Sequence, residues 1–158
     1  MIGRLLRPAD FERVLRTRSQ ASSAHFAVHH LADRPSRTAA LRRVAEADRG
    51  KLLTGDAPIS ISPVEDSLPK ALAGVWLGAV VPKRHARRAV TRTLLKRQIR
   101  VAVTARAESL SGGLWVVRLR APFDRAAFPS AASDALKRSA RAELDLVLGA
   151  AAQRLSLR

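Results

Sequence analysis

The sequence predicts an α+β fold, a two-layer sandwich in which three main helices pack on a sheet of about four strands. The chain has 158 residues, the usual size of one domain, so we expect a single domain over residues 1–158. Apolar runs of strand type and longer segments of helical periodicity follow one another along the chain. Hydrophobic residues make up 47% of the sequence and aromatic residues 4%, which predicts a core built mainly from aliphatic side chains.

The first elements are a short helix and two strand segments. Residues 8–15 predict a helix, because their apolar residues recur at i, i+3 and i+4 and share one face. Residues 25–31 alternate as a strand does, which places Phe26 and Val28 on the same face. An extended piece at residues 19–22 is expected to pair with this strand.

Residues 32–74 differ in character from the segments on either side. They contain many helix and strand breakers, namely Pro35, Gly50, Gly55, Pro58, Pro63, Pro69 and Gly74. A stretch of this length is too long for an ordinary loop between two strands. We therefore predict an insertion that is partly helical or mobile, in which residues 38–53 could form a helix.

The next elements predict a strand–helix–strand unit. Residues 75–81 are a continuous apolar run with β-branched side chains, which is typical of a buried strand. A long helix is expected from about His85 to Arg106, followed by a turn at residues 112–113. The next strand is predicted at residues 114–120.

A last helix is expected at the carboxyl end of the chain. Ser130 or Ser133 is predicted to cap it, and we expect it to run through Leu148. Five apolar residues fall on the side that should face the sheet: Ala135, Leu136, Ala140, Leu144 and Val147.

The charge of the chain indicates a polyanionic partner. There are 29 Lys and Arg residues against 13 Asp and Glu residues, which gives a formal net charge of +16. A charge this large destabilises a compact state by self-repulsion, and a nucleic acid offsets the repulsion best, because neutralised phosphates release counterions. An anionic membrane surface is the next candidate. Most of the basic residues are arginine, which suits phosphate and base contacts but also reflects genome composition.

Several classes of protein are disfavoured by what the sequence lacks. There is no Cys, so disulfides, thiolate nucleophiles and Cys-ligated zinc are excluded. The sequence has no apolar run of the length of a signal peptide or a membrane span, so a cytoplasmic location without membrane contact is expected. No metalloprotease, phosphate-loop or nucleophile-elbow motif occurs. We therefore expect no catalytic residues and no metal site in this chain, and any chemistry is expected to belong to its partner.

The strongest functional signal lies in residues 82–100, which hold eight Lys and Arg residues and no acid. In a helix, Arg88, Arg92, Lys96 and Arg100 would form a row of like charges at i, i+4 spacing. Each such pair costs roughly 0.2–0.5 kcal/mol, so the row predicts a surface that contacts phosphates. The alternative is an exposed basic face without a ligand. The candidate RNA-binding residues are Lys83, Arg84, Arg87, Arg88, Arg92, Lys96, Arg97 and Arg100.

The same segment resembles the bacterial ribonuclease P protein family, whose pattern is a Leu-Gly strand, a basic turn and a basic helix. The matching stretches are residues 77–84, 87–89 and 92–100, with Thr93 standing where the family usually has Asn. Arg4 and Leu5, with residues 10–14, resemble the family's N-terminal helix, and residues 116–120 resemble the strand after the basic helix. Residues 32–74 and the end of the chain lie outside the resemblance.

The resemblance implies a function and a topology. It implies a protein subunit that binds a catalytic RNA and precursor tRNA, with no obligatory protein partner. The RNA subunit, with Mg²⁺ as its cofactor, would remove the 5′ leader of the precursor. The implied fold is that of the second domain of ribosomal protein S5, with a left-handed βαβ crossover in place of the usual right-handed one.

Carried over residue by residue, the resemblance also implies a cleft for the single-stranded leader. Phe11, Phe26 and Val28 match cleft positions, and His29 stands where an aromatic residue is common, as does Leu15. Aromatic side chains stack on the bases of single strands, which suits this role. Plain core packing is the alternative for Phe11 and Phe26.

Three other functions remain to be distinguished. A ribosomal or other structured-RNA-binding protein would share the charge and the fold but would not assist processing. A helix-turn-helix DNA-binding protein would have a second helix before the basic one, where this sequence predicts a strand. A protein-only nuclease would need clustered acids, which the sequence does not offer near the basic helix.

Overall fold

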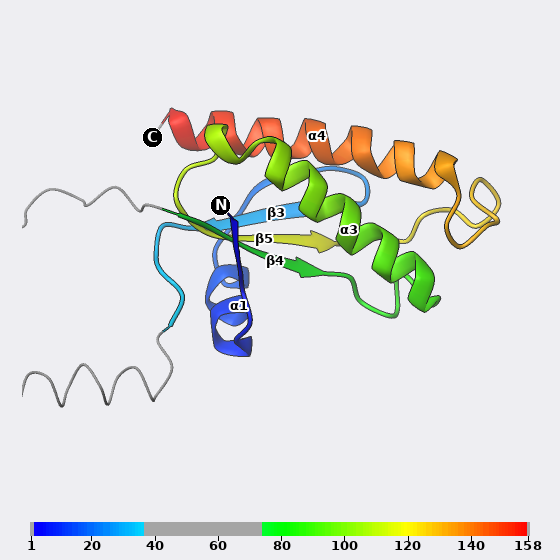
Figure 1. Ribbon diagram of the computed structural model, residues 1–158, viewed down its shortest axis with the longest axis horizontal. Helices are drawn as coiled ribbons and strands as arrows, with labels where there is room; N and C mark the ends of the chain where they lie inside the picture. The colour runs from blue at the N-terminus through cyan, green and yellow to red at the C-terminus, as the bar shows by residue number, and fades with distance from the viewer. Residues whose placement is uncertain (1, 37–73, 158) are drawn as a thin grey trace, which may run out of the picture.

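The computed structural model describes residues 2–36 and 74–157. These residues form five strands in one sheet and three α-helices, labelled as in Figure 1. The strands are β1 (Ile2–Arg4), β2 (Ser19–Ser22), β3 (Phe26–Leu31), β4 (Val75–Val80) and β5 (Gly113–Leu119). The helices are α1 (Pro8–Leu15), α3 (Ala89–Ala105) and α4 (Asp134–Ser156), with a 3₁₀ turn, η1, at Ala107–Ser109. The helix expected at residues 38–53, and most of the predicted insertion, lie outside the described residues.

The strand order across the sheet is β1-β4-β5-β3-β2. β1, β4 and β5 run parallel to one another, whereas β3 is antiparallel to β5 and β2 is antiparallel to β3. In the centre of the sheet Val117 of β5 lies between Val28 of β3 and Ala79 of β4. The predicted α+β class is confirmed.

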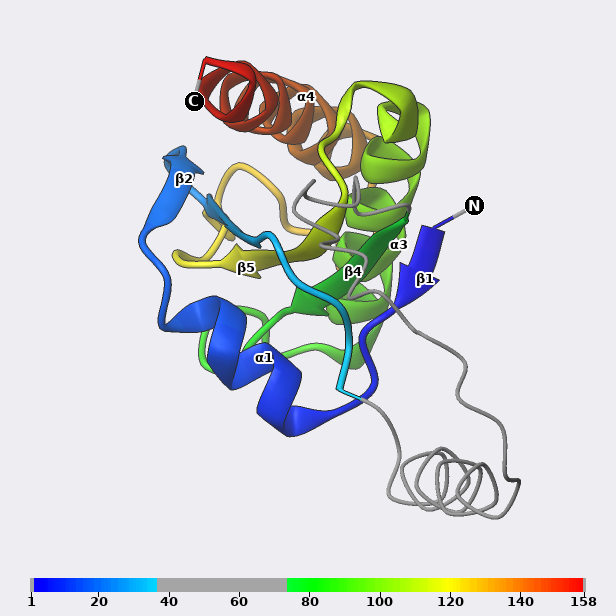
Figure 2. The ribbon, with the colours of Figure 1, turned by 90° about the vertical axis from the view of Figure 1, so that its left-hand side faces the viewer.

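The sheet separates two apolar layers of different size. α3 and α4 lie together on one face and α1 lies on the other (Figures 1 and 2). The larger core lies between the sheet and the helix pair, with Trp115, Leu95 and Leu144 among its fully buried side chains. Each such side chain contributes about 1.5–3 kcal/mol on burial. The smaller core lies under α1 and contains Leu5, Val14, Leu114 and Val116.

The unit β4–α3–β5 joins two neighbouring parallel strands through a helix on one face. In Figure 2 both strands run away from the viewer, and the chain passes from β4, over α3 above the sheet, to β5 on the left. That path turns counterclockwise as it recedes, so the crossover is left-handed, against the general preference.

The strand β1 was not predicted, and the assignment of Arg4 and Leu5 to a helix is wrong. Residues 2–4 pair in parallel with β4, and the Leu5 N–H continues the ladder by donating to the Leu77 carbonyl (3.0 Å). The Trp76 indole lies over Gly3, where an added Cβ would be 2.2 Å from the indole Cδ1. Glycine at this position therefore allows the edge strand and the indole to approach each other.

The predicted helices change at their ends. α3 begins at Ala89 instead of His85, because the backbone of Arg88 is extended (φ −78°, ψ 131°) and separates the helix from the turn in which His85 and Ala86 donate to the Pro82 carbonyl. α4 begins after Ser133, whose hydroxyl accepts from the Leu136 N–H (3.1 Å), and so confirms the predicted cap.

The last helix is also longer than predicted, continuing past Leu148 to Ser156 because Leu148 and Ala151 both pack in the larger core. Ala135 is exposed, whereas the other four residues expected to face inward are buried. None of the helices in the described part of the chain is both long and apolar enough to cross a bilayer.

Candidate nucleic-acid interface

The predicted basic residues form one exposed surface along the turn at residues 82–88 and the outer side of α3. Seven of the eight side chains are exposed, and Arg92 is half-buried. We call this set the basic face: Lys83, Arg84, Arg87, Arg88, Arg92, Lys96, Arg97 and Arg100. The opposite side of α3 supplies Leu95, Ile99 and Val103 to the larger core. The helix is therefore amphipathic, and its packing holds the basic face toward solvent.

The basic face has no neutralising carboxylates in the described part of the chain. The ion pairs found there involve other residues, such as Arg13 with Asp10 and Arg106 with Asp145. Like charges at i, i+4 spacing repel one another, and salt screens exposed charges only over a Debye length of about 8–10 Å. An anionic ligand would remove this repulsion, whereas an inert surface would keep it.

Two arginines of the basic face also hold the backbone in place. Nη1 of Arg92 donates to the carbonyls of Ala86 (3.0 Å) and Arg87 (2.7 Å), which ties the basic turn to α3. Nη1 of Arg88 donates to the Pro129 carbonyl (3.1 Å) in the connection before α4. The prediction that Arg88, Arg92, Lys96 and Arg100 form a row on the helix is wrong for Arg88, which is the N-cap residue and has an extended backbone. The other three residues of the row lie on α3.

Thr93 is exposed on α3, and the buried residues Leu94 and Leu95 follow it directly in the sequence. The replacement of the expected Asn therefore removes no packing from the core. The exposed side chain of Thr93 is available for a contact outside the protein.

Two of the predicted leader residues lie in the wrong layer. Phe26 and Val28 are fully buried on the face of β3 that packs against α3 and α4. Their side chains belong to the larger core, so the alternative of plain packing holds for Phe26, and neither residue is accessible to an RNA. The strand periodicity correctly placed Phe26 and Val28 on one face of β3, but it could not show which face of the sheet the helices cover.

Phe11 and His29 lie on the other face of the sheet, where α1 packs, and both are half-buried. The Phe11 ring covers Gly78, where an added Cβ would lie 2.4 Å from the Phe11 Cε1. Nδ1 of His29 lies 3.0 Å from the Thr17 carbonyl oxygen, which orients the imidazole beside the end of α1. Leu15 packs in the smaller core.

Further half-buried residues share this face with Phe11 and His29. Arg118 lies between Ala27 and Val80 in the strand register, and Trp76 lies farther along β4. We call this set the α1-side face: Phe11, Ala27, His29, Trp76, Val80 and Arg118. The sequence reasoning did not assign Ala27, Trp76, Val80 or Arg118 to the cleft, because a strand sequence does not show which of its two faces the helices leave open.

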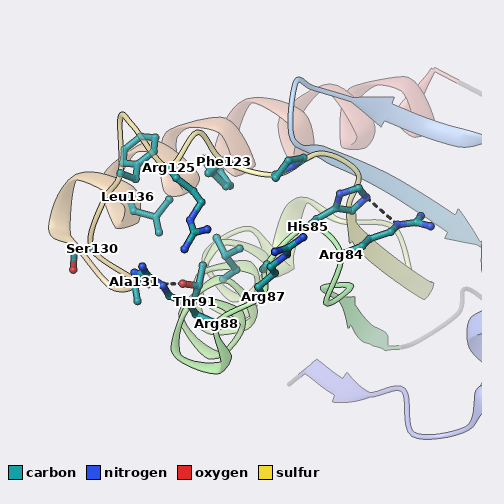
Figure 3. Close-up of a pocket in the computed structure, with 14 residues that line it drawn as sticks. Arg84, His85, Arg87, Arg88, Thr91, Phe123, Arg125, Ser130, Ala131 and Leu136 are labelled. Carbon is teal, nitrogen blue, oxygen red and sulfur yellow. Dashed lines mark hydrogen bonds between the residues drawn. The ribbon is translucent and has the colours of Figure 1, made fainter.

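Two hollows adjoin the basic face. The first, of about 340 Å³, lies between the basic turn, the start of α3 and the connection from β5 to α4 (Figure 3). The second, of about 320 Å³, lies between β1, β4 and α3. Its lining includes Lys96 and Arg100 of the basic face and Phe11 of the α1-side face. The second hollow therefore connects the two surfaces around the β1 edge of the sheet.

Among the described residues, three titratable groups have altered pKa values, namely Asp10, His30 and Glu143, and their hydrogen bonds connect elements of the fold. Burial raises the pKa of Glu143 on α4, but hydrogen bonds from the Ser23 hydroxyl, the His25 N–H (2.7 Å) and the His25 ring outweigh it and hold this pKa below its usual value. Burial lowers the pKa of His30, whose Nε2 lies 3.0 Å from the Gly112 carbonyl oxygen. In residues 2–36 and 74–157, no three His, Cys, Asp or Glu side chains are arranged to hold a metal ion.

Burial also raises the pKa of Asp10 on α1, but hydrogen bonds to its carboxylate lower this pKa by more. The Ser36 hydroxyl and N–H donate to this carboxylate, and Arg13 lies 2.9 Å from it, so the pKa of Asp10 falls below its usual value. These contacts fasten the segment after β3 to α1, on the same side of the sheet as Phe11.

Comparisons with known proteins agree on one family. The model of the family described as Ribonuclease P matches residues 3–143. A ribonuclease P protein component from Bordetella parapertussis is 41% identical over 112 residues, which cover 71% of this chain and 83% of that protein. One from Burkholderia pseudomallei is 42% identical over 82 residues, which cover 52% and 60%. The Staphylococcus aureus RNase P protein superposes with a TM-score of 0.54 over 94% of both chains at 18% identity, which supports the fold alone.

Proposed function

This chain belongs to the Ribonuclease P protein family, and we propose that it is the protein subunit of a ribonuclease P that removes the 5′ leader of precursor tRNA. Family membership implies an RNA partner. Our proposal adds that this partner is the catalytic RNA of the enzyme and that the complex also binds precursor tRNA. The observation that carries the proposal is the basic face, whose eight cationic side chains have no carboxylate partner in the described residues.

The two surfaces suit two different RNA ligands. The basic face suits a folded RNA, because exposed Lys and Arg side chains contact phosphates irrespective of sequence. The α1-side face suits a single strand, because it offers partly exposed aromatic rings for stacking and the Arg118 guanidinium for a phosphate. We assign the catalytic RNA to the basic face and the leader to the α1-side face.

In this proposal the protein positions RNA and does not cleave it. The RNA subunit, with its bound Mg²⁺, would supply the hydrolytic chemistry. The protein residues would act by binding: Lys96 and Arg100 reduce the repulsion between RNA phosphates, and Phe11 with His29 holds the leader away from the mature part of the tRNA. Such contacts matter most at low Mg²⁺, where fewer cations screen the phosphates.

The test is cleavage of a precursor tRNA by a bacterial ribonuclease P RNA at low Mg²⁺, with the protein present or omitted. We expect cleavage at the mature 5′ end only when protein and RNA are both present. Cleavage by the protein alone would contradict the absence of protein catalysis. Binding without any stimulation would favour the second candidate, a structured-RNA-binding protein without a processing role, which the basic face also fits.

Leader binding has its own test within the same system. Phe11→Ala should weaken the binding of precursor tRNA to the holoenzyme while the binding of mature tRNA stays the same. Stacking of one base contributes about 1–3 kcal/mol, which corresponds to a loss of fivefold or more. Leu146→Ala is the control, because this side chain is exposed on α4, on the opposite face of the sheet from the α1-side face. Equal losses for precursor and mature tRNA would remove the leader from the α1-side face.

A further inference from the structure

The first hollow next to the basic face has walls from two parts of the chain that are distant in sequence. Residues 84–91 form one wall, and residues 122–131 with Leu136 form the other (Figure 3). The first wall contains part of the basic turn and of α3, which carry the family's basic pattern. The second wall comes from the connection between β5 and α4.

The hollow gathers positive charge. Arg84, Arg87 and Arg88 belong to the wall of the basic turn, and Arg125 reaches toward the start of α3 from the opposite wall (Figure 3). The Arg84 guanidinium points away from Arg125, and its Nε donates to Nε2 of His85 (3.2 Å). The lining residues of the hollow include no Asp or Glu, and none of these four arginines is ion-paired within residues 2–36 and 74–157. The guanidinium groups of Arg87, Arg88 and Arg125, without counter-charges in the described residues, favour an anionic occupant.

The floor of the hollow is apolar and aromatic. Phe123 and Phe128 both line it, are partly exposed and meet edge to face, with ring centroids 5.8 Å apart and an angle of 82°. The far side of Phe123 stacks on His25 at 4.0 Å, and His25 is held in turn by Glu143. An anion alone would gain nothing from this floor, whereas a ligand with a flat apolar part would.

Hydrogen bonds hold the two walls together. The Thr91 hydroxyl on α3 donates to the Ala131 carbonyl (2.7 Å), and Arg88 donates to the Pro129 carbonyl (3.1 Å). The Ser133 cap then fixes the start of α4 directly after this wall. The hollow is therefore formed before any ligand binds, which lowers the entropic cost of binding.

We propose that this hollow binds one unpaired nucleotide of the RNA partner, with its base on Phe123 and Phe128 and its phosphate on Arg87 and Arg125. The volume of about 340 Å³ lies at the small end of ligand sites, which suits one nucleotide and not a helix. Proteins read RNA mainly at unpaired bases, which they stack on aromatic rings or on guanidinium planes. This inference rests on the proposed function, because that function supplies the RNA.

The first experiment needs no catalytic RNA. The full chain, labelled for NMR, is titrated with uridine 5′-monophosphate, with ribose 5-phosphate and with inorganic phosphate. We expect uridine monophosphate to shift the amide signals of Phe128 and Leu136 and to bind at least fivefold more tightly than ribose 5-phosphate, since stacking supplies the difference. Equal shifts and affinities for all three would leave a phosphate site without base binding and overturn the proposal. No shift at millimolar concentrations would overturn it as well.

The second experiment measures the binding of ribonuclease P RNA as a function of salt. Arg125→Gln should weaken binding about tenfold and reduce the salt slope by about one, because one phosphate contact is lost. Phe128→Leu should weaken binding at least fivefold with the slope unchanged, because stacking releases no counterions. Arg138→Gln is the control, since Arg138 is exposed on α4 and bonds only within its own helix.

The outcomes separate the two proposals. If both pocket variants bind like the control while the wild type binds well, the nucleotide pocket is overturned and the proposed function stands. If the wild type does not bind the RNA, the proposed function fails, and the mononucleotide titration still decides whether the pocket exists. Thermal unfolding of Phe128→Leu checks the fold, because Phe128 also packs on the larger core. If Phe128→Leu unfolds at a clearly lower temperature than the wild type, the Arg125→Gln variant and the mononucleotide titration test the pocket instead.

Discussion

Replacing Lys96 and Arg100 together with Gln should weaken RNA binding and flatten its dependence on salt. Both side chains are exposed on α3, one turn apart, and neither has a carboxylate partner in the described residues. Arg92 is left in place, because its guanidinium holds the basic turn and its loss would mix folding with binding. The double variant therefore removes two charges from the basic face without removing any hydrogen bond that holds the backbone.

The expected size of the effect follows from counterion release. Each phosphate contact contributes about −0.9 to the slope of log affinity against log salt, so two contacts contribute about −1.8. Between 50 and 200 mM salt, the wild type should lose about twelvefold more affinity than the variant, which is fourfold raised to the power 1.8. At low salt, where the charges act most strongly, the variant should bind clearly less tightly than the wild type.

The assay is filter binding of ribonuclease P RNA at several salt concentrations. The matched control is the double variant Lys137→Gln with Arg138→Gln, which removes the same charge from exposed positions on α4. Parallel lines for wild type and the α3 variant would refute the assignment of the basic face. Equal flattening by the α4 variant would show that net charge, and not this surface, drives binding.

Three further perturbations test the scaffold. Glu143→Gln should lower the free energy of unfolding by about 1–3 kcal/mol at pH 7. The pKa of this carboxyl lies below 4.5 in the folded state, so its contribution to the free energy of unfolding is present above that value and is lost as the pH falls through the folded pKa. A stability difference between wild type and variant that persists in acid would contradict the assignment. Gly78→Ala should cost about 1–3 kcal/mol because the new Cβ meets Phe11, and an unchanged thermal midpoint would show that the ring is not held there. Arg92→Gln should weaken RNA binding more than Lys96→Gln does, since it also loosens the basic turn, and equal losses would argue against that role.

The sequence predicted most of the elements that show a recognisable pattern of apolar residues. The predicted strands at residues 19–22, 25–31, 75–81 and 114–120 and the helix at residues 8–15 are confirmed within one or two residues. β1 was missed because three residues containing a glycine show no alternation. The start of α3 was placed too early because the sequence gives no sign that the backbone of Arg88 is extended, and this residue separates the basic turn from the helix.

The candidate site was predictable where charge alone defines it. Runs of Lys and Arg without acids are visible in the sequence, and seven of the eight predicted side chains are exposed in the structure, whereas their contacts with RNA stay a prediction. The face of a strand is a different problem, since alternation shows that Phe26 and Val28 share a side but not that α3 and α4 cover it. Phe123, Arg125 and Phe128 gave no signal either, because they lie between Pro122 and Pro129 in a segment without periodicity.

The open α1-side face follows from the topology of the sheet. α1 has eight residues, so it is about 12 Å long, and a helix is about 10 Å wide. Five strands about 4.8 Å apart span roughly 19 Å, which is more than one short helix can cover. α1 packs over β3 and β5, so the row formed by Ala27, Arg118 and Val80 and the indole of Trp76 stay half-buried. Because α3 and α4 lie together on the opposite face, α1 is the only helix of the described residues that covers this face, and our proposal assigns the part left open to an RNA strand.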